Sequence, residues 1–293
     1  MPAYTSTFHA INFLRLLCIL AQILFRDTIS YMRPDYIVDT HSHIEMIEGL
    51  TVDETLRQAS EYGVKKIILP CSDPDDLNIV NELSVKYPNV YSLLGVHPND
   101  AGKWNDNLID KIKNFISNNK KVVGIGEIGL DYHYGKDDAE KQRKVFIKQL
   151  KLANELNLPI CVHDRDAHGE TLDILKEYNK NSKVVMHCFS GSVEFMRECI
   201  KMGMYIALGG VVTFKNAAKT HEVAREIPLE KLLLETDAPF LTPEPHRGEE
   251  NRPAYTKFVA ERIAFLKGLP IEEVIAQTTI NAHALYNLGV ILL

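Results

Sequence analysis

Short apolar runs recur along the chain, each ending in polar or glycine residues, and segments of helical periodicity separate them. The runs cover residues 36–39, 66–70, 90–96, 122–128, 159–163, 183–187, 204–208 and 232–237. Continuous runs rich in Val, Ile and Leu are typical of strands that are buried on both faces. The helical patterns between them include residues 53–62, 108–118, 141–157, 171–178 and 193–202. This alternation indicates parallel βαβ units.

Eight such repeats in about 260 residues predict an α/β fold of the (β/α)8 TIM-barrel type. A doubly wound open sheet is the alternative, and it would require a topological switch point in the strand order. No low-complexity linker divides residues 32–293, so we expect a single domain. A final helix over residues 271–286 is expected to close the barrel wall.

Residues 1–31 differ in kind from the rest of the chain. The segment from Ile11 to Phe25 is almost continuously apolar, broken by Arg15 and Gln22. It is shorter than the roughly 20 residues of a transmembrane helix, and it has no clean small-residue cleavage site of a secretory signal. Its composition allows a mitochondrial-type transit peptide, and the alternative is that Met32 is the true start. We therefore separate an N-terminal extension, 1–31, from the domain, 32–293.

Composition narrows the class of protein. The apolar fraction of 45% and the charged fraction of 25% are ordinary for a globular protein with a sizeable core. A net charge of −6 argues against a broad basic face that coats nucleic acid, but not against a pocket that holds cations. Five cysteines without a CxxC pair suit a reducing compartment, so we expect a cytoplasmic protein. Cys161 and Cys188 are predicted to be buried small residues and not ligands.

Residues of metal-ligand type stand at the ends of the predicted strands. His41 and His43 follow the first strand, and the alternation of side chains aims both imidazoles into one space. In a barrel the C-terminal ends of all strands meet at one rim, where active sites lie. The candidates are His41, His43, Glu127, His163, His187 and Asp237. Nitrogen and oxygen ligands without thiolate suit Zn, Mn, Fe, Co or Mg, and six of them are enough for two cations.

Each candidate also has a simpler interpretation. A lone His163 or His187 could be a hydrogen-bonded core histidine, Glu127 could cap a helix, and Asp237 could be a turn residue. Among the other histidines, His97 follows the third strand and could contact substrate or be structural. Histidines in rim loops that could contact substrate are His168 and His246, whereas those expected at the surface or in packing are His133, His221 and His283.

From about residue 36 to 288 the chain closely resembles the TatD family of metal-dependent deoxyribonucleases, within the amidohydrolase-type barrels. The motifs that carry the resemblance are Asp39–His43, Gly95–Pro98, Gly126–Tyr132, Val162–Ala167, His187–Gly191 and Glu235–Phe240. Related phosphotriesterase-like barrels typically bridge their metals with a modified lysine on strand 4. Glu127 stands at that position here, which implies a bridging carboxylate.

The resemblance implies two divalent cations, of Mg, Mn or Zn type. His41, His43, Glu127 and Asp237 would hold one, and Glu127, His163 and His187 the other. The substrate contacts that it implies are Arg165, Ser190, Gly191 and Arg247, to which we add His97. The late family motif, usually Arg-Asn-Glu-Pro, reads Glu-Glu-Asn-Arg-Pro at residues 249–253.

The converging ligands and the resemblance together predict a metal-dependent hydrolase. The first hypothesis, which the resemblance implies, is a 3′–5′ exodeoxyribonuclease that acts on single-stranded DNA or 3′ ends through a metal-activated water, with Glu127 and Asp237 as catalytic residues and Asp237 as general base. The second hypothesis is a D-aminoacyl-tRNA deacylase that uses the same site. A non-catalytic metal-binding protein is the third, although structural metal sites are usually closed four-ligand cages. We expect no membrane association of the domain and no obligate protein partner. A basic run comprising Lys136, Lys141, Arg143 and Lys144 could guide a strand or be a solvated helix face.

Overall fold

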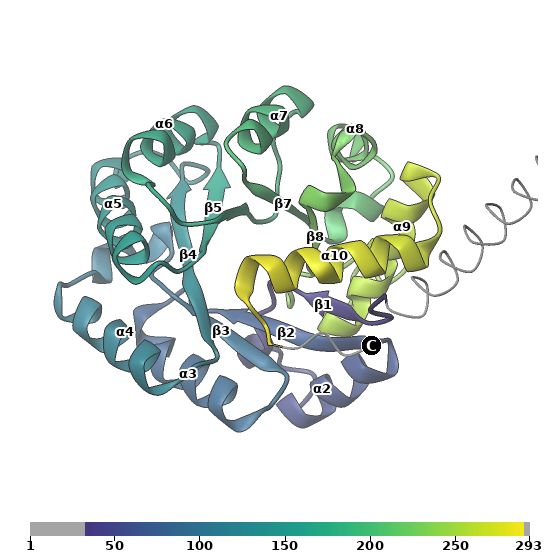
Figure 1. The fold of residues 1–293 in the computed structure, drawn as a ribbon, viewed down its shortest axis with the longest axis horizontal. Helices are drawn as coiled ribbons and strands as arrows, with labels where there is room; N and C mark the ends of the chain where they lie inside the picture. The colour runs from purple at the N-terminus through teal and green to yellow at the C-terminus, as the bar shows by residue number, and fades with distance from the viewer. Residues whose placement is uncertain (1–32, 290–293) are drawn as a thin grey trace, which may run out of the picture.

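The computed structural model describes residues 33–289, so the predicted N-terminal extension lies outside the described residues. Eight parallel strands form one sheet, and each strand pairs with the next one in the chain (Figure 1). They are β1 (Ile37–Asp39), β2 (Val64–Pro70), β3 (Val90–Leu94), β4 (Val122–Asp131), β5 (Ile160–Arg165), β6 (Val184–Met186), β7 (Tyr205–Leu208) and β8 (Leu232–Leu234). Each of the eight predicted apolar runs therefore overlaps a strand, and β2, β4 and β5 extend beyond their runs by two or three residues.

The last strand returns to the first and closes the sheet. The backbone N–H of Thr40 donates to the carbonyl of Leu234 at 3.0 Å, and that of Asp237 donates to the carbonyl of His41 at 2.9 Å. A parallel bridge also joins Ser42 to Ala238 beyond the ends of both strands. The predicted TIM barrel is confirmed, and the open sheet is excluded because the strand order contains no switch point.

Helices surround the barrel, usually one after each strand (Figure 1). They are α2 (Val52–Glu61), α3 (Leu77–Lys86), α4 (Asn107–Asn118), α5 (Ala139–Leu156), α6 (His168–Tyr178), α7 (Val193–Lys201), α8 (Ala218–Glu226), α9 (Thr256–Lys267) and α10 (Ile271–Tyr286). Short 3-10 helices lie between them: η1 (Ile44–Met46), η2 (Pro74–Asp76), η3 (Pro98–Lys103), η4 (Gly210–Thr213), η5 (Leu229–Lys231) and η6 (Pro253–Tyr255). Local signals fix several ends: Thr51 forms a capping box with Glu54 at the start of α2, and Gly268 ends α9 in a left-handed conformation.

The final helix has the predicted bounds but a different place. Ala282, Leu285 and Tyr286 of α10 join a buried cluster with one inward residue from each strand: Val38, Ile68, Leu93, Val123, Cys161, Val185, Ala207 and Leu233. The Asn281 amide donates to the carbonyl of Leu232, at the start of β8. The helix thus runs across the N-terminal end of the barrel instead of completing its wall (Figure 1). Because α10 covers the N-terminal end of the barrel, a functional site is expected at the C-terminal end.

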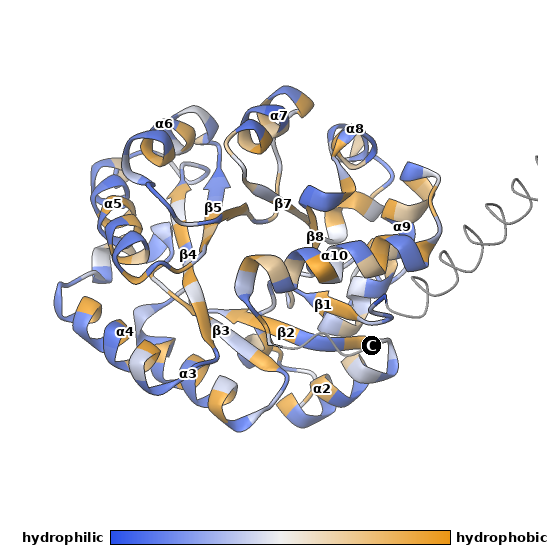
Figure 2. Ribbon diagram, in the orientation of Figure 1, coloured by the Kyte–Doolittle hydropathy of each residue, from blue (hydrophilic) through white to orange (hydrophobic). Residues whose placement is uncertain are grey.

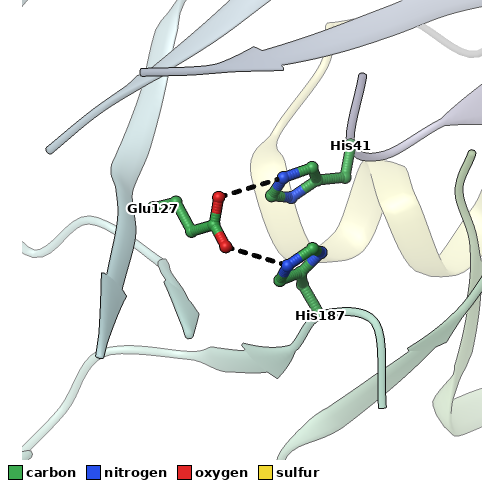
Figure 3. A group of neighbouring side chains, drawn as sticks. All are labelled: His41, Glu127 and His187. Carbon is green, nitrogen blue, oxygen red and sulfur yellow. Dashed lines mark ion pairs between the residues drawn. The ribbon is translucent and has the colours of Figure 1, made fainter. Parts of the chain in front are cut away.

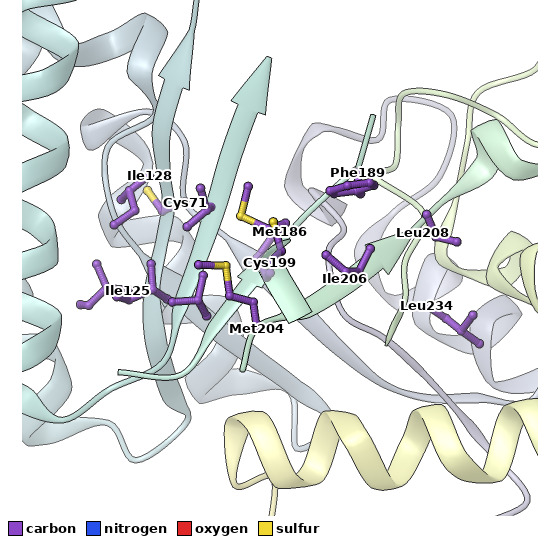
Figure 4. Packing of buried hydrophobic residues seen from close by; sticks show 14 of the residues in the cluster. Cys71, Ile125, Ile128, Met186, Phe189, Cys199, Met204, Ile206, Leu208 and Leu234 are labelled. Carbon is purple, nitrogen blue, oxygen red and sulfur yellow. The ribbon is translucent and has the colours of Figure 1, made fainter. Parts of the chain in front are cut away.

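A second, larger cluster fills the layer between strands and helices. Hydrophobic residues concentrate on the strands and on one side of the surrounding helices (Figure 2). Figure 4 shows part of this layer, with Ile125, Met186 and Ile206 contributed by three strands. Within the described residues, no helix combines the length and apolarity needed to cross a membrane.

One glycine sets the distance between β4 and β5 at the site. Gly129 pairs with His163 in the register of these strands, and its φ of +151° lies where side chains are strained. A Cβ at this position would lie 1.9 Å from the carbonyl oxygen of His163. The close approach brings His163 beside the carboxylates of β4.

Candidate metal centre

The six candidate ligands lie together at the C-terminal end of the barrel. Glu127 lies within β4 and His163 within β5, whereas the other four lie one to four residues beyond the ends of their strands: His41, His43, His187 and Asp237. Beyond β8 the backbone turns at Asp237, whose φ is +58°. A cavity of about 560 Å³ opens here and is lined by all of them except His41, which is fully buried.

The Glu127 carboxylate is the centre of this group. Its Oε1 lies 2.7 Å from Nδ1 of His163 and 2.9 Å from Nε2 of His187. Its Oε2 lies 3.3 Å from Nε2 of His41 (Figure 3). Glu127 is 3% exposed. Burying a carboxylate away from water costs several kcal/mol unless it has partners such as these histidines. The His41 and His187 rings stack with their centroids 3.7 Å apart.

A second group adjoins the first through His41. Nε2 of His41 and Nε2 of His43 lie 3.3 Å apart, and Oδ1 of Asp237 lies 3.7 Å from the former and 3.8 Å from the latter. The alternation of side chains that the His-Ser-His spacing predicts is thus present, although the two histidines follow β1 instead of belonging to it. The bridge between Ser42 and Ala238 keeps this segment extended.

Burial and neighbouring charges move the pKa values of these groups in opposite directions. Burial would raise the pKa of Glu127, but His187, His41 and His97 hold it well below its usual range. Burial raises the pKa of Asp237 to about 6 and lowers that of His41 well below its usual value. For His163, hydrogen bonds to Asp131 and Glu127 outweigh burial and raise the pKa to about 9. Carboxylate and imidazole charges therefore depend strongly on one another here.

Three carboxylates that the sequence analysis did not single out stand behind the imidazoles. Oδ2 of Asp131 lies 3.1 Å from Nε2 of His163, Oε2 of Glu235 lies 3.5 Å from Nδ1 of His187, and Oε1 of Glu45 lies 3.6 Å from Nδ1 of His43. Such partners orient histidine ligands and raise their basicity. Asp131 lies four residues from Glu127 on β4 and Glu235 two residues from Asp237 after β8, so alternation along an extended chain was the signal that could have found these two. Glu45 lies in η1, where that alternation does not apply.

Asp39 fixes the junction on which two of the predicted ligands depend. It is fully buried, and burial raises its pKa to about 8. Its side chain hydrogen bonds to the hydroxyl of Thr236 at 2.6 Å and accepts from the backbone N–H of Thr236 at 3.0 Å and of His41 at 3.3 Å. The segments that carry His41 and Asp237 are thereby held side by side.

The predicted substrate contacts divide into two groups. Arg165, Ser190 and His97 line the cavity. Gly191 and Arg247 do not line the cavity. Gly191 packs against the rings of Phe189 and Phe195, and the guanidinium of Arg247 lies 4.1 Å from the centroid of the Phe214 ring. Of the histidines in rim loops, His168 hydrogen bonds to Asp164 and His246 stacks on Tyr255, and neither lines the cavity.

The cysteines and the basic run have clear positions. Cys161 is buried as predicted, but Cys188 is only partly buried and lines the cavity. Its backbone φ of +44° turns the chain directly after β6, which an apolar pattern does not reveal. Burial and the nearby carboxylates of Asp237 and Glu235 raise the pKa of the Cys188 thiol well above its usual range, and the thiol belongs to none of the groups of possible metal ligands among the described residues. The side chains of Lys141 and Lys144 pair with Asp138 and Glu140 of their own segment, as on a solvated helix face.

The donor set fits divalent cations. Among residues 33–289, three groups have ligand atoms within 4.8 Å of one another: His41–Glu127–His187, His41–His43–Asp237 and His97–Asp131–His163. Nδ1 of His43 and Nδ1 of His187 face the carboxylates of Glu45 and Glu235, so the Nε2 atoms of both rings are the ones that face the other candidate ligands. Imidazole and carboxylate groups that converge in this way, without thiolate, match the preferences of Zn, Mn and related ions.

Comparisons with known proteins agree with this architecture. A sequence model of the family described as TatD related DNase matches residues 38–287. The uncharacterized metal-dependent hydrolase YabD of Bacillus subtilis is 44% identical over 253 residues, which are 86% of this chain and 99% of that protein. The 3'-5' ssDNA/RNA exonuclease TatD of Salmonella typhimurium is 35% identical over 241 residues, 80% of this chain and 92% of that protein. The crystal structure of YjjV, a TatD homologue of Escherichia coli K12, superposes with a TM-score of 0.81 at 32% identity and covers 86% of this chain and 98% of YjjV.

Proposed function

The chain belongs to the family of TatD-related DNases, and from this premise we propose that it is a metal-dependent 3′–5′ exodeoxyribonuclease that hydrolyses the terminal phosphodiester bonds of single-stranded DNA. The family membership supports metal-dependent hydrolysis. The observation that carries the choice of substrate is the position of Arg165 on the wall of the cavity that opens over Glu127. A guanidinium beside a cluster of metal-ligand type suits a phosphodiester, because its planar fork matches phosphate oxygens.

Two cations of Mg, Mn or Zn type would be held by the residues around Glu127. The set His41, His43, Glu127 and Asp237 would hold one, and Glu127, His163 and His187 the other. When bound, the cations supply Lewis-acid polarisation of the phosphate and of a water molecule. Both carboxylate oxygens of Glu127 lie within 3.3 Å of a ring nitrogen of His41, His163 or His187, so Glu127 would belong to both sets of ligands.

The chain's own residues supply the remaining steps. Asp237 accepts the proton of the attacking water at its carboxylate, which lines the cavity beside Glu127. Arg165 donates hydrogen bonds to the phosphoryl oxygens, where charge increases in the transition state. Asp131 and Glu235 hold the rings of His163 and His187 in place.

The test compares possible substrates on one preparation. A single-stranded DNA labelled at its 5′ end is incubated with the metal-loaded protein, beside RNA of the same sequence and a D-aminoacyl-tRNA. The proposal expects a ladder of labelled products that shorten by one nucleotide at a time, and a block when the 3′-terminal linkage is a phosphorothioate. Deacylation of the D-aminoacyl-tRNA without any shortening of DNA would contradict it and would assign the site to a carboxylic ester.

A further inference from the structure

Two large exposed rings stand at the mouth of the cavity. Among the described residues, seven large apolar side chains are exposed, and only Tyr134 and Phe240 of these line the cavity. Tyr134 is 80% exposed and Phe240 is 53% exposed. Exposed apolar surface that borders a site is a common mark of ligand binding.

The barrel topology places these rings on opposite sides of the rim. Tyr134 lies in the loop between β4 and α5, and Phe240 lies in the loop that follows β8. In a closed barrel with strands in chain order, β4 and β8 are four positions apart in either direction. The loops that carry the two rings therefore lie on opposite sides of the rim, and both rings line the cavity that also exposes Glu127.

Both rings are tied to groups of the site. The guanidinium of Arg165 lies 5.7 Å from the centroid of the Tyr134 ring, within the range of a cation–π contact. The ring of Phe240 meets that of His43 edge to face at 6.4 Å, and the backbone N–H of Phe240 donates to the carbonyl of Asp237 at 2.9 Å. Each ring is thus positioned while most of its surface remains open.

We propose that Tyr134 and Phe240 are stacking platforms for the two nucleobases on either side of the scissile phosphodiester. This inference rests on the proposed nuclease function. Stacking on aromatic side chains tolerates any base, because every base has a π face. It requires bases that are not stacked in a duplex, so the two rings select an unpaired strand. Arg165 beside Tyr134 then contacts the phosphate between the stacked bases.

The primary measurement is binding. A fluorescent single strand with phosphorothioate 3′ linkages, which resist cleavage, is titrated with metal-loaded protein and followed by anisotropy. Tyr134→Ala and Phe240→Ala are each expected to raise Kd by roughly 5- to 100-fold, whereas Tyr134→Phe and Phe240→Trp keep binding within a few-fold of wild type. Phe265→Ala is the matched control. Phe265 is 76% exposed and lies 5.3 Å from the guanidinium of Arg262, but it does not line the cavity.

A second arm pairs each ring with a base. Replacing the terminal or the penultimate base by an abasic site is expected to weaken binding to wild type and to have little further effect on the alanine variant that has lost the corresponding ring. The stacking inference would be overturned if the losses of affinity from the abasic site and from the alanine substitution added up, or if the alanine variants bound the strand like wild type. Binding that depends on the rings, without shortening of a cleavable strand, would support stacking and refute the proposed reaction. A protein that binds no single strand would overturn both.

Discussion

Asp131 provides a sharp test of how the site is built, because it touches one predicted ligand without being one. Its Oδ2 lies 3.1 Å from Nε2 of His163, and its Oδ1 accepts from the backbone N–H of His133 at 2.9 Å. The residue is 3% exposed. Asp131→Asn keeps the shape and the capacity to accept a hydrogen bond but removes the charge that faces the imidazole.

The size of the effect follows from the place of the carboxylate behind a histidine ligand. Burial would raise the pKa of Asp131, but the hydrogen bonds to His163 and His133 lower it to about 2, so this carboxylate is charged at neutral pH. Loss of a carboxylate behind a histidine ligand typically costs about 10- to 100-fold in metal affinity, or about 1.4–2.8 kcal/mol. We therefore predict weaker metal binding by a folded Asp131→Asn protein.

The assay is a competitive chelator titration with Zn²⁺ and with Mn²⁺, together with the circular dichroism spectrum and melting temperature of each metal-free variant. Asp166→Asn is the matched control, because its carboxylate lies 3.2 Å from Nδ1 of His133 but is exposed and does not line the cavity. We expect a 10- to 100-fold loss of affinity in Asp131→Asn and none in Asp166→Asn. Equal affinities in both variants would refute the positioning role of Asp131.

Three further predictions concern stability and pH. Gly129→Ala should destabilise the fold by about 3 kcal/mol or more, because its Cβ would overlap the carbonyl oxygen of His163, whereas Gly135→Ala, also at positive φ but in open space, should cost much less in chemical denaturation. Because the pKa of His163 is raised to about 9, its contribution to the stability of the metal-free protein is complete below about pH 6.5 and is lost as the pH rises through 9. Metal affinity should increase over the same pH range, because ligation needs a neutral imidazole. Calorimetry in buffers of different ionisation enthalpy should detect the protons that metal binding releases. A metal-free melting temperature that rises toward pH 9 would contradict this. Burial raises the pKa of Asp39 to about 8, so the group is mostly protonated at pH 7 and a neutral Asn can replace it. Asp39→Asn should lower the free energy of unfolding at pH 7 by only about 1 kcal/mol, whereas Asp39→Ala should lower it by about 2–3 kcal/mol. Equal losses in the two variants would refute a protonated Asp39.

The sequence predicted the barrel because burial on both faces of a parallel strand leaves a continuous apolar run, and each of the eight runs overlaps a strand. It also identified the residues that meet at the rim, since a barrel brings all C-terminal strand ends together. Local patterns do not record what lies across the barrel. Periodicity gave the bounds of α10 but not its direction across the N-terminal end. Alternation along β4 could place Asp131 on the side of Glu127, but it does not identify His163 of the neighbouring strand as its partner.

Other differences have equally local causes. Cys188 was expected to be buried, but a turn of the backbone at positive φ brings it to the cavity. Tyr134 lies in a polar loop, where no hydrophobic periodicity indicates whether an aromatic side chain is buried or exposed. Its relation to Phe240 depends on the barrel topology, which places the loops after β4 and β8 opposite each other. The N-terminal extension lies outside the described residues, so its proposed roles remain predictions.

The most direct test of the central claim is the dependence of 3′ shortening on both metal and Glu127. Protein stripped of metal is incubated with a 5′-labelled single strand, alone and after addition of Mg²⁺, Mn²⁺ or Zn²⁺, beside the isosteric variant Glu127→Gln. We predict no shortening without metal, stepwise shortening with at least one cation, and a loss of at least about 100-fold in the variant. Undiminished shortening by folded Glu127→Gln, or by wild-type protein in excess chelator, would contradict a metal centre built around Glu127.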